Sequence, residues 1–323
     1  MSGRCCVCDP RPVRRAPAVL AASLVTAAAA LAALTPSAGA APVAEAAPAA
    51  VVVPAAGPTP SSWEGGVAVP YAPRWWPHGR SNPSAPWASG WPKPVLFKPT
   101  ARGELSGIRI ALDPGHDLGN SSHLSAINQW YWVGLRKTCN TTGTATNAGY
   151  PESTYAFDVV ARVRRLLNAK GASVVVTRDR NTRGTYGPCV GARGSFPSQQ
   201  KADLMVSVHG DGAPSSGRGF HVITPGVLTG YTDDIAAPSR TLALRMIDGM
   251  RFVGLRSTTY LSSPLSVRKD VGTLNMSDVP TVMVETLNMR NAADARLAST
   301  AAGRQKIAMG LYSGIVRYLR ATR

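Results

Sequence analysis

The chain has 323 residues and a formal net charge of +17, from 35 Lys and Arg against 18 Asp and Glu. No nucleic-acid-binding motif accompanies this charge, so nucleic acid is not an expected partner. A strong positive charge biases a protein toward anionic partners but does not define its chemistry.

The first 40 residues have the features of a secretory signal peptide. Four arginines between residues 4 and 15 precede an uncharged run, Ala16 to Leu34, and Ala38-Gly39-Ala40 forms a small-x-small cleavage site. An uncleaved anchor is the alternative, but alanine dominates the run and is only marginally hydrophobic. Cleavage after Ala40 removes four arginines and Asp9 and leaves +14. We therefore expect a secreted protein, without a transmembrane segment after cleavage, whose basic surface favours anionic cell-envelope polymers.

The cysteines also suit an exported chain. Cys5, Cys6 and Cys8 would leave with the signal peptide, so only Cys139 and Cys189 remain. Two cysteines in an exported protein indicate one disulfide, here closing a loop between residues 139 and 189. The alternative of zinc ligands is disfavoured, because neither has a close Cys or His partner.

Residues 41–103 are predicted to be a linker or strap rather than a domain, because Ala, Pro, Ser and Gly dominate without a helical or strand period. Five of the seven tryptophans fall here: Trp63, Trp75, Trp76, Trp87 and Trp91. We favour a strap whose indoles pack on the globular domain over a sugar-stacking surface.

Residues 104–323 are predicted to form a single catalytic domain of α/β class, since strands and helices alternate. Apolar runs predict strands at 108–112, 173–177, 204–208, 219–224 and 281–284. Amphipathic patterns predict helices at 153–170, from 238 to about 253, and at the end of the chain. The alternation indicates an α/β sheet with helices on both faces.

Two of these strands end in a histidine. Asp113-Pro114-Gly115 turns the chain after the first strand and delivers His116, and the strand at 204–208 runs directly into His209. Functional groups gather beyond the carboxyl ends of strands in an open α/β sheet, so both histidines should share one site. A metal site is the expectation.

Two carboxylates should join them. Glu152 stands where a loop becomes the first helix, at the edge that receives His116, and Glu285 ends the strand at 281–284. His116, Glu152 and His209 make a typical catalytic zinc set, with a fourth position left for water. Glu285 then suits proton transfer better than coordination.

These four segments resemble the zinc-dependent N-acetylmuramoyl-L-alanine amidases of the Amidase_3 type, from about residue 108 to 319. The family's D-P-G-H turn, early-helix glutamate, A-D-x-x-x-S-x-H strand and P-x-x-x-V-E strand appear in order, at 113–116, 152, 202–209 and 280–285. The resemblance implies zinc on His116, Glu152 and His209, and Glu285 as catalytic glutamate. It also implies a fold with a mixed, mostly parallel sheet flanked by helices on both faces. It also implies a secreted enzyme that cleaves the amide between N-acetylmuramic acid and L-alanine in peptidoglycan, with zinc-bound water as nucleophile.

The chain departs from the family pattern at two places. Leu287-Asn288 follows the catalytic glutamate where the family has glycine and an aromatic residue, and Gly210-Asp211 replaces the usual alanine-asparagine. The long insertion at 118–150, with its cysteine, resembles actinobacterial members. His123 and His221 match no ligand motif and are treated as non-ligands.

Two other functions stay open at this stage. One is a zinc carboxypeptidase or other peptidase acting on wall peptides, which an arginine placed in the pocket to grip a terminal carboxylate would favour. The other is a wall-binding protein without turnover. The presence of all four site residues disfavours the wall-binding hypothesis, because a protein that only binds does not need three metal ligands and a catalytic glutamate.

Overall fold

A computed structural model describes residues 61–69 and 90–323. The expected signal peptide and Trp75, Trp76 and Trp87 lie outside these residues.

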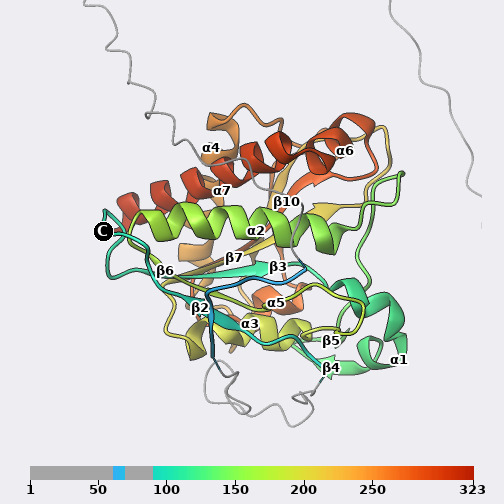
Figure 1. Cartoon of the computed structure of the whole chain (residues 1–323), viewed down its shortest axis with the longest axis horizontal. Helices are drawn as coiled ribbons and strands as arrows, with labels where there is room; N and C mark the ends of the chain where they lie inside the picture. Colours follow the sequence, from blue (N-terminus) through green and yellow to red (C-terminus); the bar gives the residue numbers. More distant parts are fainter. Residues whose placement is uncertain (1–60, 70–89) are drawn as a thin grey trace, which may run out of the picture. The chain divides into compact units, whose positions relative to one another are not determined.

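The domain is built on one twisted sheet, which has eight strands within the described residues, in the order β1-β2-β6-β3-β7-β10-β8-β9 (Figure 1). Neighbours from β6 to β10 are parallel, as are β8 and β9, whereas β1, β2 and β8 run antiparallel to a neighbour. The bounds are β1 Val67–Ala68, β2 Val95–Phe97, β3 Arg109–Pro114, β6 Ser173–Val176, β7 Leu204–Asp211, β8 His221–Pro225, β9 Leu265–Arg268 and β10 Thr281–Asn288.

Helices cover both faces of the sheet. Figure 1 shows α2 and α7 above it and α3 and α5 below it. The helices are α1 Leu124–Ile127, α2 Glu152–Ala169, α3 Val190–Gln199, α4 Ala236–Phe252, α5 Gly272–Asn275, α6 Ala292–Ser299 and α7 Ala301–Thr322, with a 3-10 turn at Leu118–Ser122. In the described part of the chain, no helix is long and apolar enough to cross a membrane. The prediction of a mixed, mostly parallel sheet between helices is confirmed.

The apolar patterns of the sequence correspond to this layering. Strands β3 and β7 are covered on both faces, so both read as continuous apolar runs and not as alternating ones. On α2 the apolar stripe of the amphipathic pattern is fully buried, at Ala156, Val159, Val160, Val163 and Leu167. This packing fixes the two strands that carry the histidines.

Several short or edge elements were not predicted, and three of them bear on the site. Strand β2 lies inside the expected strap and pairs with β6, but three residues are too few to show a period. Strand β9 is largely exposed at the sheet edge. Helix α3 contains Gly191, Gly194 and Pro197, which disfavour a helix. Its packing compensates: a Cβ on Gly194 would lie 2.4 Å from the carbonyl oxygen of Thr273, so α3 and α5 touch through backbone.

A buried ion pair joins α3 to the sheet. Arg193 Nη1 donates to Asp113 Oδ1 at 2.6 Å, and the hydroxyls of Thr177 and Ser207 donate to the same carboxylate. Burial opposes the charge on Asp113, but Arg193 and these hydroxyls outweigh it and lower the pKa of the carboxyl group. Asp113 therefore stays ionised inside the core.

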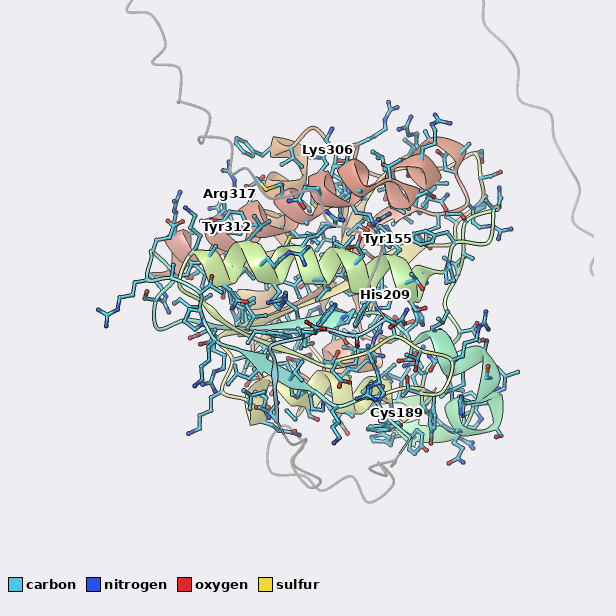
Figure 2. All side chains as sticks on the ribbon, in the orientation of Figure 1. Tyr155, Cys189, His209, Lys306, Tyr312 and Arg317 are labelled. Atoms are coloured by element: carbon cyan, nitrogen blue, oxygen red, sulfur yellow. A yellow bond between two sulfur atoms is a disulfide. The ribbon has the colours of Figure 1, made fainter. Side chains whose placement is uncertain are left out.

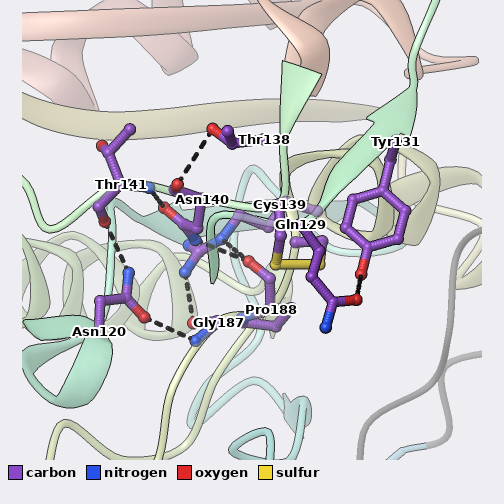
Figure 3. Close-up of a disulfide and its surroundings, with 11 residues drawn as sticks. Asn120, Gln129, Tyr131, Thr138, Cys139, Asn140, Thr141, Gly187 and Pro188 are labelled. Atoms are coloured by element: carbon purple, nitrogen blue, oxygen red, sulfur yellow. Dashed lines mark hydrogen bonds between the residues drawn. A yellow bond between two sulfur atoms is a disulfide. The ribbon is translucent and has the colours of Figure 1, made fainter. Parts of the chain in front are cut away.

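The insertion at 118–150 is fastened to the start of α3. It contains a small hairpin, β4 (Trp130–Trp132) with β5 (Arg136–Thr138), and Cys139 after β5 forms a disulfide with Cys189. Figure 3 shows hydrogen bonds around this link, including Asn140 Nδ2 to the Pro188 carbonyl at 2.8 Å. The disulfide expected from the cysteine count is thus present in the structure.

The two described tryptophans of residues 41–103 both pack on the domain. Trp63 stacks on Phe157 of α2 with ring centroids 4.1 Å apart. Trp91 is buried and packs in a cluster with Cys139 and Cys189. Both contacts are of the kind that the strap hypothesis predicts.

Replacing Arg193 with Met should strongly destabilise the protein, because Asp113 would be left as a buried charge without its partner. We expect a loss of about 3–5 kcal/mol in the free energy of unfolding, measured by denaturant titration. The matched control is Arg245→Ala, which breaks the exposed pair with Asp248 and should cost about 0.5 kcal/mol or less. Equal losses in the two variants would contradict the role given to Arg193.

Candidate metal centre

His116 is presented by a sharp turn after β3. It has a left-handed backbone, with φ of 54°, which is unusual for a residue other than glycine. Two buried arginines hold this turn: Arg178 donates to the carbonyls of Pro114 and Gly115, and Arg193 to those of Pro114 and His116, at 2.6 to 3.1 Å. The strained conformation of the turn is therefore fixed by hydrogen bonds between two guanidinium groups and three backbone carbonyls.

The ring of His116 is oriented by the insertion loop. Its Nδ1 donates to the carbonyl oxygen of Thr141 at 3.0 Å, so Nε2 is the nitrogen that carries the lone pair when the ring is neutral. A second hydrogen bond of this kind fixes the tautomer of metal-binding histidines. Burial lowers the pKa of His116, but the charge of Glu152 and the hydrogen bonds to Glu152 and Thr141 together raise it, and the net shift is upward.

Glu152 is the first residue of α2 and is 3% exposed. Its Oε2 accepts from the amide of Thr144 at 2.8 Å, and its Oε1 accepts from the amide of Gly210 at 3.2 Å. Burial raises the pKa of Glu152, but His116 and His209 outweigh it and hold the pKa well below its usual range. The carboxylate is thus charged and fixed from two sides.

His209 completes a compact group. Its Nδ1 lies 2.8 Å from Glu152 Oε1, and His116 Nε2 lies 3.2 Å from the same oxygen. One donor atom from each of the three residues falls within 4.8 Å of the others. Figure 2 shows His209 beside the end of α2 that carries Tyr155, the end at which the helix begins.

The group has the composition and spacing of a zinc site. Two ligands at tetrahedral angles around zinc, each about 2.0–2.1 Å from the ion, are about 3.3 Å apart. The surroundings leave little room: a Cβ on Gly115 would lie 2.4 Å from the His209 ring, and one on Gly143 2.9 Å from Glu152 Oε2. Two imidazoles and one carboxylate, closely packed and fixed by further hydrogen bonds, fit such an ion.

Glu285 lies beside this group on β10. In the sheet it pairs with His209 on one side and with His221 on the other, so the three side chains share a face. Its Oε2 is buried without a hydrogen-bond partner among the described residues. Burial, and then the carboxylates of Glu152 and Asp211, raise the pKa of Glu285 well above its usual range.

The two histidines predicted to be non-ligands are outside the group. His123 Nδ1 donates to the carbonyl of Gly119, and its ring stacks on Tyr186. His221 lies at an edge-on angle to Tyr260, whose hydroxyl donates to Asp211 at 2.8 Å. The departure at Asp211 therefore adds a carboxylate that Tyr260 holds next to Glu285.

A groove opens over His116, His209 and Glu285. Its volume is about 270 Å³, and the far wall includes Lys137 of the hairpin and Arg268 at the end of β9. Sequence reasoning missed Arg268, Arg193 and Tyr260, because each reaches the site only through tertiary packing. For an arginine in the pocket, the sequence analysis offered one general expectation: a carboxypeptidase would need such a residue to bind a terminal carboxylate.

Known proteins with the same pattern share this architecture. The family model described as N-acetylmuramoyl-L-alanine amidase, Amidase_3, matches residues 110–317. An N-acetylmuramoyl-L-alanine amidase of Mycobacterium tuberculosis is 34% identical over 230 residues, which is 70% of this chain and 92% of that protein.

Two crystal structures agree with that match. The N-acetylmuramyl-L-alanine amidase Ami1 from Mycobacterium smegmatis is 33% identical, with a TM-score of 0.62 over 68% of this chain and 99% of its own. Ami1 from Mycobacterium abscessus is 35% identical, with a TM-score of 0.62 over 67% of this chain and 100% of its own. The resemblance in the four sequence segments is confirmed, and the chain belongs to the Amidase_3 family of N-acetylmuramoyl-L-alanine amidases.

Proposed function

We propose that the chain is a secreted, zinc-dependent enzyme that cleaves the amide between N-acetylmuramic acid and L-alanine in peptidoglycan. The observation that carries the proposal is the buried group of His116, Glu152 and His209, with Glu285 on the neighbouring strand. Family membership supports the substrate. The two imidazoles and two carboxylates supply what hydrolysis of an unactivated amide requires.

The three clustered residues are proposed as the metal ligands. Zinc held there supplies a Lewis acid that polarises the amide carbonyl and lowers the pKa of a water molecule to about 7. His116 offers Nε2 because its Nδ1 donates to Thr141, and Glu152 is charged and held by two backbone amides. These contacts orient the ligands before substrate arrives.

Glu285 is proposed to move the proton. It accepts a proton from the attacking water and passes it to the nitrogen of L-alanine as the amide bond breaks. Its buried Oε2 has no other hydrogen-bond partner in the described chain, so this oxygen is available to the reacting groups. The products are a free lactyl carboxylate on the sugar and a stem peptide with a free amino terminus.

A carboxypeptidase acting on wall peptides is the second candidate, because Arg268 is an arginine in the groove. The two activities differ in the end of the peptide that they attack. A carboxypeptidase needs the arginine to hold the last carboxylate of the stem. An amidase leaves the stem intact.

The test of function uses protein recovered from the culture medium, whose N-terminus is expected at Ala41 if residues 1–40 are a signal peptide. Incubation with muropeptides should release intact stem peptides that begin with L-alanine, detected by mass spectrometry. Release of terminal D-alanine, with the lactyl amide intact, would establish the carboxypeptidase instead. Protein that stays in the cytoplasm with residues 1–40 attached would refute export.

His116→Ala and His209→Ala should each lose bound zinc and amidase activity, because two remaining ligands bind the ion weakly. Metal content after dialysis, measured by mass spectrometry, is compared with turnover of muropeptides. His123→Ala is the matched control and should keep both, since that ring is bonded to the Gly119 carbonyl and stacked on Tyr186, outside the three-residue group. One zinc per chain in active, dialysed His116→Ala would show that the ligand assignment is wrong.

Glu285→Gln should keep its zinc but lose turnover by about 100-fold or more, because the amide has the same shape and cannot accept a proton. Glu104→Gln, an exposed carboxylate paired with Arg320 far from the groove, is the control and should behave as wild type. Loss of metal from Glu285→Gln would identify Glu285 as a ligand. A near-normal rate would remove it from the mechanism.

A further inference from the structure

We infer that Arg268 is a specificity-determining residue that binds a free carboxylate on the second residue of the stem peptide. The inference rests on the proposed amidase function and names the part of the substrate that the groove selects. Arg268 ends the edge strand β9 and lines the same groove as His116, His209 and Glu285. The family match and the metal cluster do not assign it a role.

Two cationic side chains, Arg268 and Lys137, lie at this end of the groove. Arg268 Nη2 lies 2.6 Å from Asp270 Oδ2, and Lys137 Nζ lies 3.9 Å from the same oxygen. Two cations thus share the carboxylate of Asp270, and the carboxylates of Glu285 and Asp211 also act on the charge of Arg268. The side chains of Arg268, Lys137 and Asp270 are between 38% and 45% exposed, so an arriving ligand can reach them.

Asp270 also orients the guanidinium group. It accepts from Nε at 2.8 Å and from Nη2 at 2.6 Å, and therefore occupies one edge of the planar group. Nη1 and the outer N–H of Nη2 make no hydrogen bond within the described residues. That pair forms the fork with which arginine binds a carboxylate through two parallel hydrogen bonds. Asp270 therefore fixes the orientation of the Arg268 guanidinium group, and the edge formed by Nη1 and Nη2 remains available for a carboxylate.

The size of the groove indicates which carboxylate is bound. A volume of about 270 Å³ is just below the range of about 300–1,000 Å³ that holds a drug-sized ligand, so it fits about two amino-acid residues. With the scissile amide of L-alanine at Glu285, the carboxylate within reach belongs to the next residue. In peptidoglycan that residue is D-glutamate linked through its side chain, which leaves its α-carboxylate free, or D-isoglutamine, in which an amide replaces it.

Another role for Arg268 must be separated from this one. Its charge lowers the pKa of Glu285, against the larger upward effect of burial. If this were its only function, removing it would slow all substrates alike and shift the pH profile. Binding of a carboxylate instead predicts an effect that depends on the substrate.

The experiment compares two substrates that differ in one group: N-acetylmuramoyl-L-alanyl-γ-D-glutamate and the corresponding D-isoglutamine. Secreted, zinc-loaded wild-type enzyme should favour the carboxylate by about tenfold or more in kcat/KM, mostly through KM, because a charged hydrogen-bonded pair is lost with the amide. Arg268→Gln should abolish this preference. Arg268→Lys should keep the charge but lose most of the preference, because it lacks the fork.

Arg180→Gln is the matched control. Arg180 is held by Asp179 through the same two atoms, at 3.1 and 3.0 Å, its side chain is 44% exposed, and it does not line the groove. It should keep the wild-type preference. Calorimetric binding of the product dipeptides, L-alanyl-γ-D-glutamate against its amide, gives a readout that does not depend on turnover.

The outcomes separate the two proposals. Equal kcat/KM for both substrates in the wild type, or an unchanged preference in Arg268→Gln, would overturn the role of Arg268 while leaving the amidase intact. A uniform fall in kcat with a shifted pH profile would also overturn it, in favour of an effect through Glu285. Removal of D-alanine from longer stems, with no lactyl amide cleaved, would instead refute the proposed function.

Discussion

The buried pair between Asp113 and Arg193 connects the three parts of the molecule on which the site depends. Asp113 belongs to the central strand β3, Arg193 belongs to α3, and the remaining N–H groups of Arg193 reach the carbonyls of the turn that carries His116. A single guanidinium group thus holds a helix, a strand and a ligand-bearing turn together. It does so in the interior, where an unpaired charge is costly and alternative arrangements of the turn are disfavoured.

Much of the site could be predicted from sequence because its signals are local. A strand covered on both faces is a continuous apolar run, and a polar residue directly after such a run must lie at the sheet edge. His209 and Glu285 follow this rule, although β7 and β10 continue a few residues past the predicted ends, and His116 follows its strand after the turn at 113–115. Glu152 was locatable because Pro151 and the preceding loop mark the start of a helix.

The features that escaped prediction are those decided by tertiary contacts. Helix α3 contains two glycines and a proline, and it forms because its close approach to α5 and the contacts of Arg193 outweigh weak local propensity. Strand β9 is half exposed and lacks an apolar run, so the local sequence pattern does not predict a strand there. Arg268 enters the groove only because β9 pairs with β8, and Tyr260 reaches Asp211 from a loop 49 residues away in sequence. Contacts of this kind, between residues far apart in the chain, cannot be predicted from local patterns in a single sequence.

The two arginines at the His116 turn have a consequence for the choice of ion. Magnesium and calcium prefer oxygen ligands, and backbone carbonyls are among the groups that calcium sites recruit. Here the carbonyls of Pro114, Gly115 and His116 accept hydrogen bonds from positively charged guanidinium groups, which makes them poor ligands for a further cation. What faces the centre is two imidazole nitrogens and one carboxylate, a donor set that disfavours hard cations and favours zinc and its first-row neighbours. In the proposed centre, the guanidinium groups that fix the turn would thereby also bias the choice of metal.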